Sequence, residues 1–195
     1  DPRFVADLRV CYTAIPQIGE KLGAISALVD AMDGRRDIPQ IEFIAGDATV
    51  ALVFRHLQPL SDRDRDALVT FAQVQGFAIF LQPGGVDSVQ ALWPQDPPLS
   101  FALPQWNVEL KFRPLDFIQV NAGLNQRMIA KTLELLDVQP DDRVLDLFCG
   151  LGNFTLPLAR ASGDGEVVGV EGDAGLVQRA RANAAHNGLT NVQFH

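Results

Sequence analysis

The sequence predicts an α/β protein in two parts: an α+β region over residues 1–112 and a parallel α/β region over residues 113–195. Two observations favour this division. Before residue 113, short apolar runs and helical patterns are joined by tight turns, which is typical of sequential, mostly antiparallel strands. After residue 113, strand and helix patterns alternate regularly, which is typical of βαβ units and a parallel sheet.

In the first region, apolar residues at three- and four-residue spacing predict a helix over residues 15–32. Ser61, followed by acidic residues, predicts the start of a second helix that ends at Gly76. The residues between and after these helices predict strands, of which the last two form a hairpin. These strands are expected over residues 41–45, 49–56, 77–81, 88–93, 99–103 and 108–112.

The second region shows a helix followed by three strands and two more helices in strict alternation. The expected elements are residues 123–137, 143–148, 153–161, 166–171, 173–187 and 191–194. A nucleotide-binding α/β fold has about five to seven strands, and only three are found here. We therefore expect a fragment, in which residues 113–195 form the first half of a longer domain.

Composition limits the classes of protein to consider. With 195 residues, 47% hydrophobic and 21% charged, the chain can bury a sizeable core. No apolar run approaches the ~20 residues that span a bilayer, and no signal-peptide pattern opens the chain. We therefore expect a cytoplasmic protein with no membrane partner. A net charge of −8 and a pI near 4.7 argue against a nucleic-acid partner, because phosphates normally bind a basic face.

The strongest motif, Leu145-Asp-Leu-Phe-Cys-Gly-Leu-Gly-Asn-Phe, joins a strand to a helix. Gly150 and Gly152 allow a ligand to approach the backbone, and the helix start supplies free N–H groups. Glu171 ends the next strand, where an acid can accept hydrogen bonds from ribose hydroxyls. Thr155 replaces the third glycine of a dinucleotide fingerprint. The pattern therefore favours S-adenosylmethionine (AdoMet) over NAD; another nucleotide, or a loop without a ligand, is the alternative.

A second motif, Asp116-Phe-Ile-Gln-Val-Asn-Ala-Gly, precedes the first helix of this region. It predicts a strand that carries Phe117, Gln119 and Asn121 on one face. An amide can bind the edge of a pyrimidine, and an aromatic ring can stack on it. The alternative is a strand whose polar residues face solvent and bind nothing.

These two motifs and Val170-Glu-Gly together resemble the RNA uracil-5-methyltransferases, in particular those that act on 23S rRNA. The resemblance is most specific over residues 114–195. It implies a central α+β domain over residues 1–112, followed by half of a Rossmann-like, class I AdoMet-dependent methyltransferase domain. A tRNA-directed relative is the alternative within the family. Outside the family, the alternatives are a non-enzymatic RNA- or protein-binding module and part of an NAD-type oxidoreductase.

The resemblance also implies roles for individual residues. Gln119 would orient the target uracil and face AdoMet. The remaining residues at AdoMet-binding positions would be Phe148, Gly150, Gly152, Asn153 and Glu171. The family mechanism needs a Cys that attacks C6 of uracil and a Glu base, and by resemblance both lie beyond His195. The fragment alone is therefore expected to be inactive.

The two cysteines have different expected roles. Cys149 lies in the glycine loop, which argues against its being the nucleophile. The resemblance implies that Cys11 would be the fourth cysteine ligand of a 4Fe-4S cluster in the full-length protein. The other three ligands are absent here, so no cluster is expected in this chain alone. By resemblance, an RNA-binding domain would precede Asp1, and this would account for the acidic composition. Finally, a sheet cut after three strands exposes unpaired edges, so we expect the chain to dimerise through them or to leave residues 114–195 loosely ordered.

Overall fold

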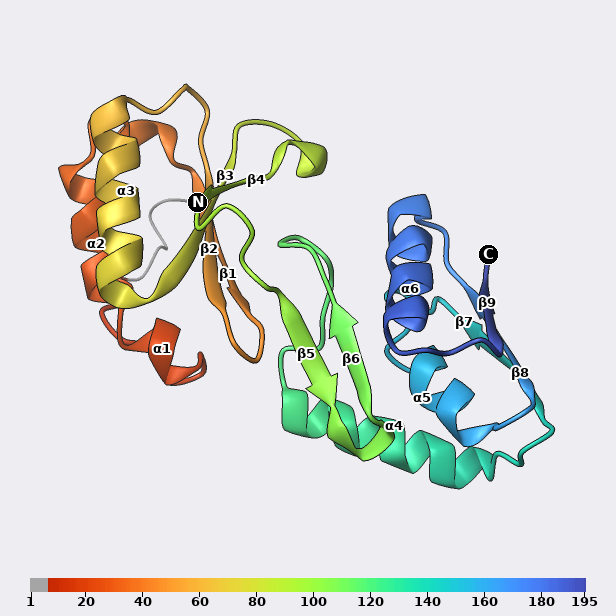
Figure 1. Cartoon of the computed structure of the whole chain (residues 1–195). Helices are drawn as coiled ribbons and strands as arrows, with labels where there is room; N and C mark the ends of the chain where they lie inside the picture. Colours follow the sequence, from red (N-terminus) through yellow and green to blue (C-terminus); the bar gives the residue numbers. More distant parts are fainter. Residues whose placement is uncertain (1–6) are drawn as a thin grey trace. The chain divides into compact units, whose positions relative to one another are not determined.

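The computed structural model describes residues 7–195. The chain divides into two compact units, the first of which ends at Pro98 while the second comprises Leu99–His195 (Figure 1). This boundary lies before the one predicted after Phe112, and the hairpin of residues 99–112 therefore belongs to the second unit. Among the described residues, no helix is long and apolar enough to cross a bilayer.

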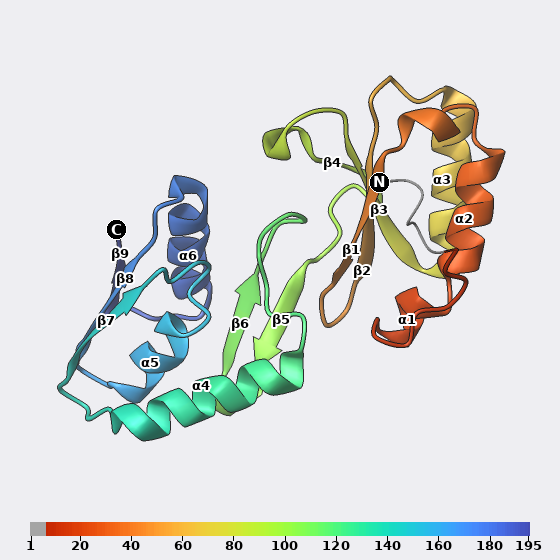
Figure 2. The same cartoon turned by 180° about the vertical axis from the view of Figure 1, so that it is seen from behind.

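The first unit has two layers, a four-stranded sheet and helices that cover one of its faces (Figures 1 and 2). The strands lie in the order β1-β2-β3-β4. Their bounds are Gln40–Ala45, Val50–Arg55, Phe77–Gln82 and Gln90–Trp93, and the helices are α1 (Pro16–Gly19), α2 (Leu22–Ala31) and α3 (Asp62–Gln75). The core lies between the layers, where Met32, Leu68 and Phe54 are almost completely buried.

Two predictions for the first unit need correction. The helix expected over residues 15–32 is two helices, which are separated by a turn at Glu20 and Lys21. Strands β2 and β3 run parallel, not antiparallel, because α3 crosses between them. The predicted limits of α3 are confirmed: the Ser61 hydroxyl accepts a hydrogen bond from the Asp64 N–H, and Gly76 ends the helix with a φ of 75°.

The second unit begins with a hairpin, β5 (Ser100–Leu103) and β6 (Val108–Lys111). Two asparagines bind the free edge of β6: Asn183 of α6 (Ala174–His186) and Asn187, the C-terminal cap of that helix. The Asn183 amide pairs with the N–H and C=O of Lys111, at 2.9 and 3.0 Å. The Asn187 amide pairs likewise with Glu109, at 2.8 and 2.7 Å. These four hydrogen bonds explain why the hairpin groups with the residues that follow it.

The parallel sheet predicted for the second unit is confirmed. Strands β7 (Arg143–Leu147), β8 (Glu166–Val170) and β9 (Val192–Phe194) pair in parallel and in sequence order. Helices α5 (Thr155–Ala161) and α6 cover one face of the sheet, and α4 (Ala122–Leu136) precedes β7 (Figures 1 and 2). On β7, Leu145 and Leu147 are 61% and 57% exposed, so this part of the sheet is not covered by the described residues.

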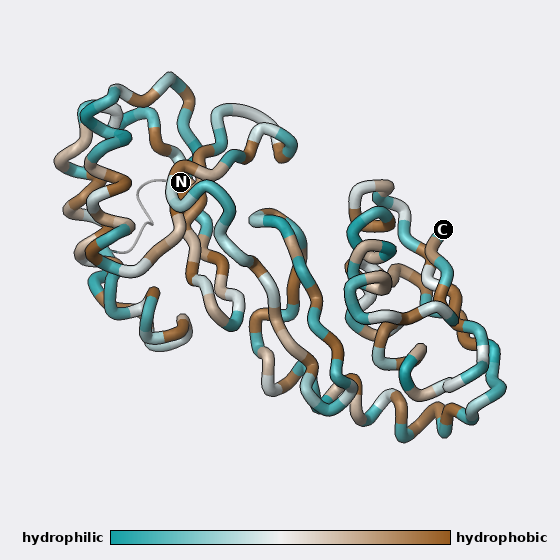
Figure 3. Tube along the Cα trace, viewed as in Figure 1, coloured by the Kyte–Doolittle hydropathy of each residue, from teal (hydrophilic) through white to brown (hydrophobic). Residues whose placement is uncertain are grey.

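Helix α4 forms where the sequence predicts it, but its apolar side is exposed. Leu124, Met128 and Leu136 lie at the surface, while Asn125 and Ile129 are buried. Apolar and polar residues alternate along this helix, and apolar segments also run along the strands of both units (Figure 3). Burial on α4 is therefore set by the loop that packs against it and not by hydropathy alone.

Candidate functional site

The glycine loop lies at the carboxyl end of β7 and has an unusual backbone. Phe148, Gly150 and Gly152 all have positive φ angles, of 60°, 55° and 93°. Phe148 is therefore strained as a non-glycine residue, and its side chain is 89% exposed. A Cβ at Gly150 would meet no atom within 4 Å, so the backbone there is open to a ligand.

Glu171 connects the ends of β7 and β8. Its two carboxylate oxygens accept hydrogen bonds from the backbone N–H groups of Gly150 and Asp173, each at 3.1 Å. The side chain is half-buried, so the carboxylate keeps part of its surface open. The predicted ribose-binding acid and the predicted glycine loop are thus brought together by a direct contact.

Asp146 lies beneath this loop. The Thr155 hydroxyl donates to its carboxylate at 2.6 Å, which holds the start of α5 against β7. Burial raises the pKa of the Asp146 carboxyl, and the hydrogen bonds from Thr155 partly oppose that shift. Thr155, which replaces the third fingerprint glycine, therefore has a structural role in this loop.

Cys149 is a poor nucleophile in this position. Its side chain is 5% exposed, and burial together with the charges of Asp146 and Glu171 raises the pKa of its thiol to about 11. At neutral pH the group is a thiol and not the thiolate that attacks. The geometry therefore supports the prediction that Cys149 is not the nucleophile.

Asn153 is bound to α4. Its side-chain amide and that of Asn125 donate to each other, at 2.8 and 2.9 Å. Asn125 is 3% exposed and Asn153 is half-buried, so the pair is partly shielded from water. Asn153 was expected to contact AdoMet, but in this structure its amide binds Asn125 and fixes the glycine loop to α4.

The segment that carries Gln119 is a loop, and the strand predicted there is absent. The Asn121 side chain accepts a hydrogen bond from the Leu124 N–H at 2.9 Å and caps α4, so it does not pair with Gln119 on a common strand face. Gln119 itself is exposed, and Phe117 is 79% exposed. The prediction of one polar strand face was therefore wrong, although both side chains that could bind a base are accessible.

Cys11 lies in the first unit, whereas the residues described above belong to the second. Its thiol lies 3.1 Å from the Thr13 hydroxyl, and this hydrogen bond lowers the pKa of Cys11. Residues 7–195 contain no cluster of three or more His, Cys, Asp or Glu residues that could hold a metal ion.

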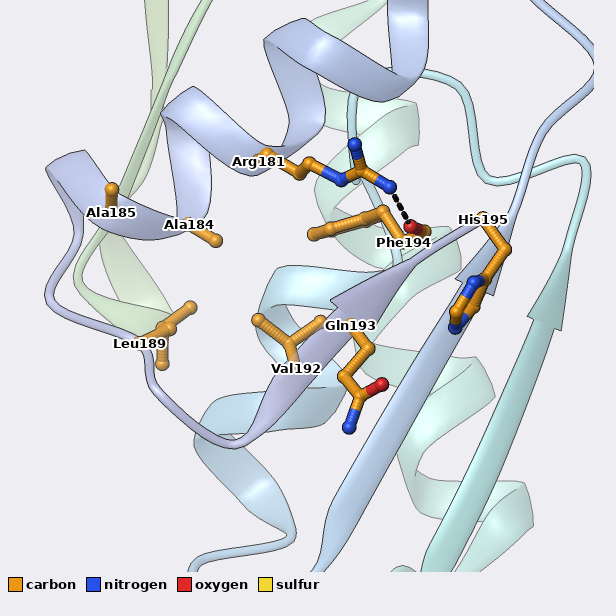
Figure 4. Close-up of a pocket in the computed structure, with 8 residues that line it drawn as sticks. All are labelled: Arg181, Ala184, Ala185, Leu189, Val192, Gln193, Phe194 and His195. Carbon is orange, nitrogen blue, oxygen red and sulfur yellow. Dashed lines mark hydrogen bonds between the residues drawn. The ribbon is translucent and has the colours of Figure 1, made fainter. Parts of the chain in front are cut away.

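A cavity of about 390 Å³ lies between α6 and β9 (Figure 4). It is lined mainly by apolar side chains, and Arg181 bonds the Phe194 carbonyl at one side. It contains none of the predicted site residues. The candidate site is therefore the group of loops at the carboxyl ends of β7 and β8, where open α/β sheets bind their ligands.

Sequence reasoning missed two side-chain pairs that support these loops, Asn125–Asn153 and Arg179–Asp116. A sequence signal exists only for the first, because Asn125 is a polar residue one turn before Ile129 on α4. Arg179 lies 63 residues from Asp116, and nothing in the sequence pattern links the two.

Comparison with known proteins agrees with this site. Residues 139–195 match the family model described as a methyltransferase domain. The Pyrococcus abyssi tRNA (uracil-54, C5)-methyltransferase, solved in complex with S-adenosyl-L-homocysteine, has a similar fold: 17% identity, a TM-score of 0.68, and coverage of 98% of this chain and 49% of that one. Together with the parallel sheet and glycine loop, this defines the fold of the second unit as that of the class I AdoMet-dependent methyltransferases.

The whole chain also has much closer relatives in sequence. It is 74% identical over 195 residues to the 23S rRNA (uracil(1939)-C(5))-methyltransferase RlmD of Xanthomonas axonopodis pv. citri, and 64% identical over 194 residues to the RlmD of Xylella fastidiosa strain Temecula1. All of this chain is covered, but only 44% and 43% of those proteins, so it spans less than half their length. The resemblance to RNA uracil-5-methyltransferases predicted from the motifs is thus confirmed.

Proposed function

We propose that this chain is part of an AdoMet-dependent 23S rRNA (uracil-C5)-methyltransferase. The observation that carries the proposal is the 74% identity with RlmD across all 195 residues, which include the glycine loop, Glu171 and the Gln119 loop. Because the relatives are more than twice as long, the complete activity is assigned to the full-length protein and not to these residues alone.

The residues at the candidate site fit AdoMet. The open backbone at Gly150 admits the ligand, and the exposed Phe148 ring offers a face for packing. Gly152 is buried, and a Cβ there would lie 3.1 Å from Leu156, so this glycine lets the loop pack closely on α5. Glu171 holds the ribose hydroxyls while its bond to the Gly150 N–H keeps the loop in place. Asn153 acts through its pair with Asn125. When bound, AdoMet supplies a methyl group from its electrophilic sulfonium.

Gln119 is proposed to bind and orient the target uracil, because it is exposed in the loop that directly precedes α4. The resemblance implies that a cysteine thiolate adds to C6 of uracil, which makes C5 nucleophilic, and that a glutamate later removes the C5 proton. Cys149, with its raised thiol pKa, is not suited to this step. We assign the nucleophile and the base to the part of the relatives that this chain does not match.

Cys11 is proposed as one ligand of an iron–sulfur cluster in the full-length protein. In support, its thiol pKa is lowered, which favours the thiolate that binds iron. The described residues by themselves do not fit a cluster, because no further cysteine lies near Cys11. No step of the methyl transfer is derived from it.

We further propose a cytoplasmic location and 23S rRNA as the partner, with no membrane association. The acidic composition of this chain indicates that most of the phosphate-binding surface belongs to other parts of the full-length protein. The isolated chain is proposed to dimerise through β7, whose outer edge pairs with no described strand and whose Leu145 and Leu147 are exposed.

The test compares two RNA substrates and two proteins. The full-length protein is incubated with AdoMet and either unmodified 23S rRNA or tRNA, and 5-methyluridine is measured by mass spectrometry of nucleosides. We expect product on 23S rRNA, at the position for which the relatives are named, and none on tRNA. Product on tRNA alone would favour the tRNA-directed alternative. The isolated 195-residue chain should give no product on either, and activity from this chain would refute the assignment of the nucleophile.

A further inference from the structure

The ion pair between Arg179 and Asp116 differs from the other ion pairs of the described residues. The guanidinium of Arg179 on α6 lies 2.6 Å from one Asp116 oxygen, and the two side chains are 19% and 8% exposed. The remaining pairs, including that of His186 with Glu109, have exposed side chains, and solvent screening makes them weak. A buried pair fixes positions much more strictly, because separating it leaves a charge without a partner.

Asp116 also closes the turn that precedes the Gln119 loop. Its second oxygen accepts a hydrogen bond from the Arg113 N–H at 2.7 Å, and its own N–H donates to the Arg113 carbonyl. The carboxylate thus holds the turn and binds it to α6 at the same time. Gly175 leaves room for this contact, since a Cβ there would lie 3.2 Å from a terminal nitrogen of Arg179.

The loop of residues 117–120 is fixed by side-chain hydrogen bonds at both of its ends, which we call its anchors. Asp116 fixes its start, and Asn121, the N-terminal cap of α4, fixes its end. Between them the backbone has no regular structure, and Phe117 and Val120 are 79% and 94% exposed. Apart from the half-buried Ile118, the side chains of the loop contribute little to holding Gln119, so its position depends mainly on the anchors.

We infer that Arg179 is a positioning residue for Gln119: through Asp116 it sets where the uracil-binding loop lies. The inference rests on the proposed function for the role of Gln119. Helix α6 starts directly after Glu171 and is capped by Asp173, whose N–H binds the Glu171 carboxylate. One helix thus carries both the contact to the proposed ribose-binding acid and the contact to the proposed uracil-binding loop, which fixes the two subsites relative to each other.

The first experiment measures the loop without relying on activity. Amide hydrogen exchange of the 195-residue chain is compared with that of the Arg179→Ala variant. We expect faster exchange at Arg113 and Asp116, whose N–H groups are hydrogen-bonded within the turn that the pair holds, and unchanged exchange in α4 from Ile129 onward. Unchanged exchange at Arg113 and Asp116 would overturn the inference, and so would a general rise across the second unit, because the pair would then be a packing element and not a loop anchor.

The second experiment is kinetic and uses the full-length protein. Arg179→Ala should lower kcat for 5-methyluridine formation by ~10- to 100-fold while the Kd for AdoMet changes less than ~3-fold, since a misplaced reacting group costs rate rather than cofactor binding. The Gln119→Ala variant should show the same pattern. The double variant with Gln119→Ala and Arg179→Ala should be no slower than the Gln119→Ala variant, because Arg179 acts through Gln119. Multiplied effects would overturn the inference.

Conservative variants guard against misfolding. Arg179→Lys keeps the charge, and Asp116→Asn keeps an oxygen for the Arg113 N–H, so both should retain more activity than Arg179→Ala. Equal loss in all three, with unchanged thermal stability, would contradict the inference. Lys131→Ala removes a cation from an exposed pair with Glu134 and serves as the matched control with unchanged rate. The two claims can fail separately. If the unsubstituted full-length protein forms no 5-methyluridine but the expected exchange difference is seen, the proposed function is wrong while the anchoring of the loop by Arg179 is supported.

Discussion

Asn125 and Asn153 exchange two hydrogen bonds through their side-chain amides, at 2.9 and 2.8 Å, although 28 residues separate them. Each amide uses one donor and its acceptor on the other, so the pair is reciprocal. One partner lies in the buried part of α4 and the other in the glycine loop. The pair therefore joins the segment that follows the Gln119 loop to the segment that is proposed to bind AdoMet.

Replacing Asn125 with alanine should destabilise the second unit and weaken AdoMet binding. The change leaves the Asn153 amide without its partner, and we expect a loss of about 1–3 kcal/mol in the free energy of unfolding. Urea denaturation of the 195-residue chain measures it. The neighbouring Gln126→Ala change on the same helix serves as the control. Losses that simply add in the Asn125→Ala/Asn153→Ala double variant would show that the two amides act independently.

Glu171→Ala in the full-length protein should weaken AdoMet binding by about 1–3 kcal/mol, because ribose hydroxyls and the Gly150 N–H both lose an acceptor. Glu171→Gln keeps one acceptor oxygen and should be intermediate. Gly150→Val should be worse than either, since a branched side chain at a φ of 55° is strained and fills the open approach. Isothermal calorimetry reports the affinities. Unchanged binding in all three variants would place AdoMet elsewhere.

The two thiols should differ sharply in reactivity with iodoacetamide. With a pKa of about 11, only about 0.1% of Cys149 is thiolate at pH 8, and the fraction rises as pH approaches the pKa. Cys11, whose thiol pKa is lowered, should react first. Peptide mapping after timed alkylation distinguishes the two, and a Cys11→Ser variant should then label slowly at pH 8. Rapid labelling of Cys149 under those conditions would reopen its candidacy as the nucleophile.

The isolated chain should associate as its concentration rises. The outer edge of β7 lacks a described partner strand, and Leu145 and Leu147 are exposed on one face of this strand. Light scattering across a dilution series should therefore show dimers that dissociate, and Leu145→Lys with Leu147→Glu should shift the equilibrium to monomers. A chain that stays monomeric, with amides of residues 143–147 protected as strongly as those of residues 77–82, would show that this edge is covered.

The parts of the fold that the sequence predicts well are those with strong local signals. Ser61 and Gly76 mark the ends of α3 because an N-terminal cap and a left-handed glycine are determined by one or two residues. The glycine loop and Glu171 are recognisable for the same reason: their spacing between strands follows from the βαβ pattern, and the structure brings them into direct contact.

Other features depend on contacts that are distant in sequence. Strands β2 and β3 have the apolar composition of either sheet type, and only the crossover through α3 makes them parallel. The segment around Gln119 has strand-like residues, but the Asp116 and Asn121 side chains hold it as a loop. The spacing of Leu124 and Met128 predicts that they form the buried face of α4. In the structure both are exposed, and the glycine loop contacts Asn125 instead.

The asparagine contacts between α6 and β6 have a geometric consequence. Residues four apart on a helix rise about 6 Å, and residues two apart on a strand rise about 6.8 Å, so the two spacings nearly match. Asn183 and Asn187 can therefore bind Lys111 and Glu109 as a neighbouring strand would, each with one donor and one acceptor. The match holds in a single register. Inserting one residue between Glu109 and Lys111 would move one of the two backbone sites out of reach of its amide and detach the hairpin from the helix.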